Sequence, residues 1–147
     1  MAEHLDGTPS LLPYDIVARF PIGSFLENIA VRSDGTLLVS NMTSGEIFYI
    51  DSKDKNPQST VQVIHDFNTT LEVPQEEVGG HGAYGSKYQA EAIVEHPDIA
   101  DIFYTVSGLY GKAGTWAVYR LDLRQFDSVH TSATIKIEKL IDVPQAI

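Results

Sequence analysis

Two glutamates in matching sequence contexts are the first candidates for chemistry in this chain of 147 residues. Glu27 opens the segment ENIAV and Glu91 opens the similar segment EAIVE. A glutamate at the start of an apolar strand can act as a general acid or base, or as a ligand, and burial raises its pKa. The alternative is a solvated or hydrogen-bonded carboxylate with no role in a reaction. We expect Glu27 to be catalytic and Glu91 to bind substrate.

A glycine-rich loop supplies two further candidates. His81 and Tyr84 lie in the segment GGHGAYG, residues 79–85. A histidine there can donate a hydrogen bond to a developing oxyanion or shuttle a proton. A tyrosine can stack on an aromatic substrate or donate from its hydroxyl. We therefore predict a catalytic His81 and a substrate-binding Tyr84, against the alternative of a flexible surface loop.

Residue types and spacings exclude several common catalytic sites. The chain has no cysteine, which excludes disulfides, thiolate catalysis and cysteine-ligated zinc. It has neither the His-x-x-x-His nor the His-Glu-x-x-His spacing of helical zinc sites, and no Gly-x-Ser-x-Gly nucleophile elbow. No Lys-Ser/Thr pair follows the glycine-rich loop, so nucleotide binding is not expected.

The segments that must position these residues are short β-rich runs separated by turn residues, with little helical periodicity. The expected strands cover residues 14–20, 28–32, 36–40, 47–51, 60–67, 90–95, 102–107, 115–123 and 134–143. An irregular stretch over residues 68–89 interrupts them and carries four glycines. A connection of this length within a compact domain is usually functional or mobile.

An internal repeat relates the two halves of the chain. After Glu27 and after Glu91 the same order follows: a turn, an apolar strand, a loop, a strand ending in aspartate and a more polar strand. The glutamates are 64 residues apart and the aspartates, Asp51 and Asp122, are 71 apart, so the difference lies in loop length. A four-stranded antiparallel meander with an apolar first strand is typical of a β-propeller blade, whose inner strand lines a central channel.

The sequence therefore predicts an all-β fold of about two propeller blades plus one outer strand, which makes an incomplete ring. The expected parts are an N-terminal tail at 1–13, followed by a partial propeller at 14–147. The propeller divides into an outer strand of a closing blade at 14–20, blade 1 at 21–67, the glycine-rich loop at 68–89 and blade 2 at 90–147. A propeller needs at least about four blades. Either the chain is truncated, or several copies form a ring, or the fold is different; we favour truncation.

Residues 25–40, FLENIAVRSDGTLLVS, resemble the first blade of the SMP-30/gluconolactonase/LRE-like family. Residues 116–124, WAVYRLDLR, look like the fungal branch of that family. The resemblance covers roughly residues 15–147 and implies a six-bladed propeller. Its metal-dependent members are lactone hydrolases, in which a glutamate followed by Gly-Pro helps to hold a divalent cation such as calcium or zinc. Glu27 matches that metal ligand, but Asn28 and Ile29 replace the Gly-Pro pair.

The fungal branch with the Glu-Asn-Ile-Ala start is similar to proteins encoded in secondary-metabolite gene clusters. Some of these proteins catalyse hetero-Diels–Alder cyclisations, which join a quinone-methide-type partner to an alkene without a metal or any other cofactor. The resemblance therefore implies a metal-independent cyclase that acts on a small apolar intermediate. A metal-dependent lactone hydrolase is one alternative, and an inactive remnant or binding module is another.

Composition and charge narrow the range of partners. The chain has 10 Lys and Arg against 20 Asp and Glu, a net charge of −10. Such a chain repels nucleic acids and anionic membranes. No apolar run is long enough to cross a bilayer, and residues 1–9 are polar and acidic. The sequence favours a soluble, cytoplasmic protein with a small-molecule substrate, no nucleic-acid or membrane partner, and self-association through the open blade faces.

Overall fold

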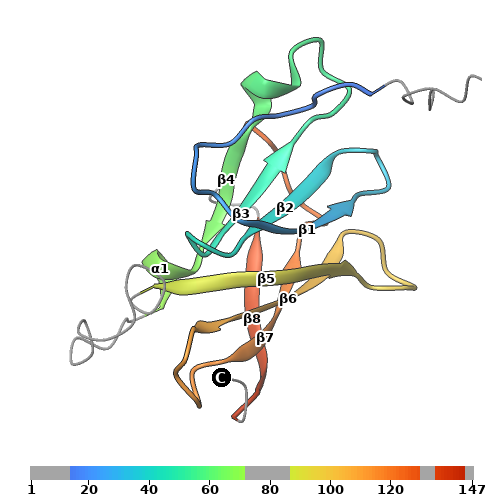
Figure 1. Ribbon diagram of the computed structural model, residues 1–147. Coiled ribbons are helices and arrows are strands. Elements are labelled where there is room, and N and C mark those ends of the chain that lie inside the picture. The colour runs from blue at the N-terminus through green and yellow to red at the C-terminus, as the bar shows by residue number, and fades with distance from the viewer. Residues whose placement is uncertain (1–13, 72–86, 130–134, 145–147) are drawn as a thin grey trace, which may run out of the picture.

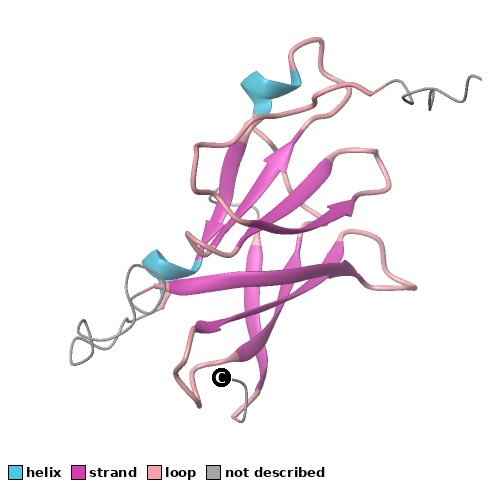
Figure 2. Cartoon of the chain, in the orientation of Figure 1, coloured by secondary structure: helices cyan, strands magenta, loops and turns pink. Residues whose placement is uncertain are grey.

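The computed structural model describes residues 14–71, 87–129 and 135–144. These residues form two four-stranded antiparallel sheets, with little helix (Figure 1, Figure 2). In each sheet the strands follow one another in chain order, so each sheet is a meander. The two sheets are not closed into a ring, as expected for an incomplete all-β propeller.

Sheet A contains the first four strands. They are β1 (Leu26–Val31), β2 (Leu37–Asn41), β3 (Glu46–Ile50) and β4 (Gln62–Asp66). A short 3-10 helix, η1 (Pro57–Thr60), precedes β4, and a single helical turn, α1 (Phe67–Thr70), follows it. The Asp66 carboxylate caps α1 by accepting a hydrogen bond of 2.8 Å from the backbone N–H of Asn68.

Sheet B contains the last four strands. They are β5 (Tyr88–Glu95), β6 (Ile102–Leu109), β7 (Ala117–Asp122) and β8 (Lys136–Asp142). The strand β5 begins two residues earlier than the sequence pattern indicates. In Figure 1 it crosses the molecule between sheet A and the other strands of sheet B, with α1 beside its first residues. It packs against β1, β2, β3 and α1, so β5 makes most of the contact between the sheets.

The hydrophobic core lies between the two sheets. Its buried side chains come from both, because alternate residues of each strand face the other sheet. They are Ala30, Leu38, Ile47, Tyr49, Ile64 and Phe67 from the first half and Tyr88, Ala90, Ile93, Phe103, Leu109, Ala117, Tyr119, Leu121 and Leu123 from the second.

The strand registers confirm the internal repeat. Ile29 lies opposite Val39 in sheet A, and its counterpart Ile93, 64 residues later, lies opposite Thr105 in sheet B. Both inner strands carry a β-bulge next to the glutamate, and both outer strands carry one opposite the third strand. The two sheets are therefore equivalent strand by strand, and the inner-strand bulge lies at Glu27 in β1 and one position later, at Ala92, in β5.

The registers also correct one detail of the repeat. The serines that end the two apolar segments of the sequence, Ser40 and Ser107, are not equivalent. Ser107 lies opposite Ala90, as Asn41 lies opposite Leu26, whereas Ser40 lies one residue earlier. The inner-strand bulges do not cause this shift, because β1 and β5 carry one each; Ser40 is the counterpart of Val106, and Asn41 is the counterpart of Ser107.

Residues 14–20 carry no strand, contrary to the sequence-based expectation. They run past β4 and η1 and lie on a face of sheet A (Figure 1). The Phe20 ring meets the Phe48 ring edge-on at 5.0 Å, and the backbone N–H of Arg19 donates to the Gln58 side chain. A strand needs the free edge of another strand for its ladder, and a segment on a sheet face has none. Whether these residues belong to a closing blade stays a prediction.

Within the described ranges, no helix has the length and apolar character needed to cross a membrane.

Candidate functional site

Glu27 and Glu91 lie on the two inner strands, β1 and β5, which pack against each other. Glu27 is exposed and Glu91 is half-buried. The two carboxylates are near enough for the charge of Glu27 to raise the pKa of Glu91. The fold therefore brings together two residues that are 64 positions apart in the sequence.

A β-bulge adjoins each of these glutamates. Glu27 is itself the residue without a partner in the β1–β2 ladder, between Leu26 and Asn28. In β5 the additional residue is Ala92, directly after Glu91, and its φ of 49° is in the left-handed region. A bulge re-aims the side chains beside it, and such positions are common near active sites.

Thr105 holds the bulge in β5. Its hydroxyl lies 2.7 Å from the carbonyl oxygen of Ala92 and 3.1 Å from that of Glu91, and it can donate to either. Thr105 is only 1% exposed, so no water competes for this contact. The backbone that carries Glu91 is thus fixed from the β6 side.

The two carboxyl groups differ in electrostatic environment. Burial is the main cause that raises the pKa of Glu91, and the nearby charge of Glu27 raises it further. Glu91 therefore keeps its proton to a higher pH than an ordinary glutamate. A carboxyl that keeps its proton in this way can act as a hydrogen-bond or proton donor where an ordinary glutamate is charged.

The other predicted site residues, His81 and Tyr84, lie outside the described residues. Their roles stay predictions.

Glu27 was also expected to be a metal ligand if the chain binds calcium or zinc. No group of three or more His, Asp or Glu side chains gathers anywhere in residues 14–71, 87–129 and 135–144. The pair on the inner strands offers two carboxylates, whereas calcium takes about six to eight oxygen ligands. The donors described do not fit such a site by themselves.

A cleft on the outer side of the sheet–sheet junction was not expected from the sequence. It has a volume of about 660 Å³ and is lined by β4, α1, β7 and β8. An aromatic series crosses its wall: the rings of His65 and Phe67 are 4.4 Å apart, and those of Phe67 and Tyr119 are 4.9 Å apart. Burial lowers the pKa of His65 and raises that of Tyr119, so burial favours the neutral form of both.

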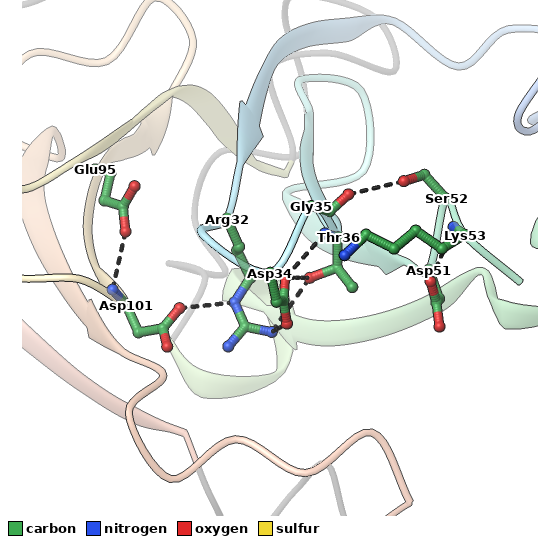
Figure 3. A network of polar contacts seen from close by, with 9 residues as sticks. All are labelled: Arg32, Asp34, Gly35, Thr36, Asp51, Ser52, Lys53, Glu95 and Asp101. Atoms are coloured by element: carbon green, nitrogen blue, oxygen red, sulfur yellow. Dashed lines mark hydrogen bonds and ion pairs between the residues drawn. The ribbon is translucent and has the colours of Figure 1, made fainter.

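A polar network at the other end of β1 ties the two sheets together (Figure 3). Arg32, which is 8% exposed, donates from Nε to Asp101 in the β5–β6 turn at 2.9 Å. It also pairs with Asp34 at 3.3 Å and lies over the Phe126 ring. The Asp34 carboxylate in turn accepts from the backbone N–H and the hydroxyl of Thr36.

Sequence reasoning did not single out Arg32 or Asp101. The available signal was a charged residue at the end of the apolar strand, just before the Ser33-Asp34-Gly35 turn, and an aspartate at the equivalent turn of the second repeat. Asp101 has a φ of 61°, and its backbone N–H donates to the Glu95 carboxylate at 2.9 Å. The network is thus built from both blade turns.

No protein-family model matches the chain, and no curated protein matches it either.

Proposed function

We propose that this chain forms two blades of a β-propeller enzyme, a metal-independent cyclase of hetero-Diels–Alder type that acts on a small apolar intermediate. The observation that supports it most directly is the pairing of Glu91 with Glu27 across the inner strands, with the pKa of Glu91 raised. The resemblance of residues 25–40 to the first blade of the SMP-30/gluconolactonase/LRE-like family, and of residues 116–124 to its fungal branch, suggests the reaction type. The cytoplasmic location expected from the sequence also stays a prediction.

The chemistry requires orientation and one hydrogen-bond donor. A quinone-methide-type reactant and an alkene form one carbon–carbon and one carbon–oxygen bond from their own π electrons, and no proton is consumed. Negative charge grows on the oxygen of the first reactant in the transition state. A protonated Glu91 would donate a hydrogen bond to this oxygen, and an inner-strand wall would hold the two apolar reactants together. Burial, and to a smaller extent the charge of Glu27, would favour the protonated form of Glu91.

The test measures cyclisation of an ortho-quinone methide with an alkene by the 147-residue chain, for the natural sequence and for Glu91→Gln and Glu95→Gln. Glu95 lies on the same strand and serves as the matched control. Glu91→Gln removes the proposed hydrogen-bond donor and should slow the cyclisation about 100-fold. The control should leave the rate unchanged. Equal rates for the chain and Glu91→Gln, or no rate above background at any protein concentration, would refute the assignment.

A titration with calcium and with zinc distinguishes the cyclase from the alternative function, a metal-dependent lactone hydrolase. The cyclase should bind neither ion saturably at micromolar concentrations. Micromolar binding that disappears in Glu27→Gln would favour the hydrolase. An inactive remnant would lack a cooperative thermal transition as well as activity.

A further inference from the structure

Equivalent positions of the two sheets have opposite exposure. Ala30 in β1 is 9% exposed, whereas its counterpart Val94 in β5 is 59% exposed. Ile93 in β5 is 4% exposed, whereas its counterpart Ile29 in β1 is 58% exposed. Each sheet thus packs one face against the other sheet, in a contact that we call the internal junction, and leaves its other face open. The open face of sheet A corresponds to the buried face of sheet B, and the open face of sheet B corresponds to the buried face of sheet A.

Large apolar side chains occupy both open faces. On sheet A, Val31 and Val63 are 60% and 41% exposed in addition to Ile29. On sheet B, Ile141 is 61% exposed in addition to Val94, and Tyr104 and Val118 beside them are half-buried. Arg120 and Glu138, which form an ion pair at 3.4 Å, lie on the same face of sheet B beside these apolar side chains. Exposed large apolar side chains grouped on one face of a protein mark an interaction site.

We propose that two copies of this chain associate head to tail, the open face of sheet B in one copy covering the open face of sheet A in the next. The internal junction is the template for this contact. There, Ile93 of β5 shares one buried cluster with Ala30 and Leu38 of sheet A. Repeating the junction places Ile29 of one copy against Val94 and Tyr104 of the next, because these are the equivalent positions.

The occupant is a second copy because one chain carries both halves of the contact. Such an interface is heterologous, so repeated addition closes a ring if the rotation allows it. Propellers contain about four to eight blades, which corresponds to two to four copies of two blades. The association is independent of any role of Glu27 and Glu91 in a reaction.

Residues 14–20 fit within this arrangement. They lie over β3 and η1, with Phe20 on Phe48, and leave the β1 side chains of the same face uncovered. In the internal junction, the two sheets leave a cleft of about 660 Å³ between their outer strands. The same space in a contact between two copies would lie where residues 14–20 cover sheet A. The inner strands make the close contact in the junction, so the inner half of the face is the part that must remain free.

The experiment is light scattering with size-exclusion chromatography on the 147-residue chain from about 1 to 100 µM. The variants are Ile29→Lys, which blocks the open face of sheet A, and Val94→Lys, which blocks that of sheet B. The control is Ile22→Lys, at a fully exposed residue in the turn before β1. Circular dichroism checks that each variant is folded.

The natural chain and the control should have a mass of two or more times the chain mass of 16.2 kDa. Each blocked variant should be a monomer, with the dissociation constant raised about 100-fold. A mixture of Ile29→Lys with Val94→Lys should give a dimer, because one unblocked face of each kind remains. A monomeric natural chain at every concentration, or a mixture that stays monomeric, would overturn the proposal.

Discussion

Arg32 at the end of β1 donates from Nε to the carboxylate of Asp101 at 2.9 Å and so joins the turn of one sheet to the turn of the other. The two residues are 69 positions apart. The guanidinium is largely buried, while Asp101 is 24% exposed on its side chain. A charge held in this position needs its partner, since an unpaired buried charge is strongly unfavourable.

Replacement of Arg32 by Ala should destabilise the fold by about 1.5–3 kcal/mol, because a charge-assisted hydrogen bond between the sheets is lost. The measurement is urea unfolding followed by circular dichroism. Asp34→Asn is the control, since Asp34 contacts the same guanidinium but is 51% exposed. A midpoint for Arg32→Ala no lower than that of the control would show that the pair does not hold the sheets together.

Glu91 should make the fold more stable in acid than at neutral pH. Its pKa is raised in the fold, so its contribution is complete below the pKa of an unfolded glutamate and is lost as the pH rises through the folded value. Glu91→Gln should therefore be more stable than the natural chain at neutral pH and equal to it in acid. Denaturant midpoints across this pH range test the sign.

Glu27→Gln should lower the pKa of Glu91, because the charge of Glu27 is one of its two causes. Burial is the larger cause, so part of the shift should remain. Carboxyl-carbon NMR during an acid titration measures it, with Glu95→Gln as the control. A pKa that does not move in Glu27→Gln would mean that the two carboxyls are not coupled.

Asp122 should titrate at a pH of about 2, far below an ordinary aspartate, chiefly because of its hydrogen bonds with Arg124. The Asp122 carboxylate lies 2.6 Å from Nη2 of Arg124. Its contribution to stability is present above the unfolded pKa and is lost as the pH falls toward 2. Arg124→Ala should move the NMR titration of Asp122 upward more than Arg120→Ala does. The reverse order would contradict this assignment.

Gly108→Ala should destabilise sheet B, because a Cβ at this position would clash with the indole ring of Trp116. Over-packing of this kind costs about 1–3 kcal/mol. Trp116 is the one tryptophan of the chain, so its fluorescence reports the unfolding directly. In a double-mutant cycle with Trp116→Leu, followed by circular dichroism, Gly108→Ala should lose much less stability than it does in the natural chain. An equal loss in both backgrounds would point to another cause.

The strands and the repeat could be read from the sequence because alternation and turn residues are local. The matched positions of Ile29 and Ile93 hold in the strand registers, and so do those of Ile50 and Leu121, the residues that precede the two aspartates. The places of Glu27 and Glu91 on the two inner strands were also predicted, whereas the electrostatic coupling between them comes from the structure. These predictions required only the order of elements along the chain.

The features of the fold and of the site that were not predicted from the sequence depend on three-dimensional packing. The contact of Arg32 with Asp101 arises only when the sheets meet, and no local pattern encodes it. Residues 14–20 have the alternation of a strand, but they lie on a sheet face without a free edge to pair with. The α1 turn at Phe67–Thr70 depends on the Asp66 cap and on the packing of Phe67 in the core.

The strictly sequential strand order has a consequence for folding kinetics. Within each sheet every strand pairs with its neighbour in the chain, and β1 and β2 are separated by only a short turn. Loop closure within each sheet therefore costs little conformational entropy, whereas the docking of one sheet on the other joins distant residues. We expect each meander to form early and the pairing of Arg32 with Asp101 to follow in the slow step. Mutations at this junction would then change the folding rate more than mutations within either sheet.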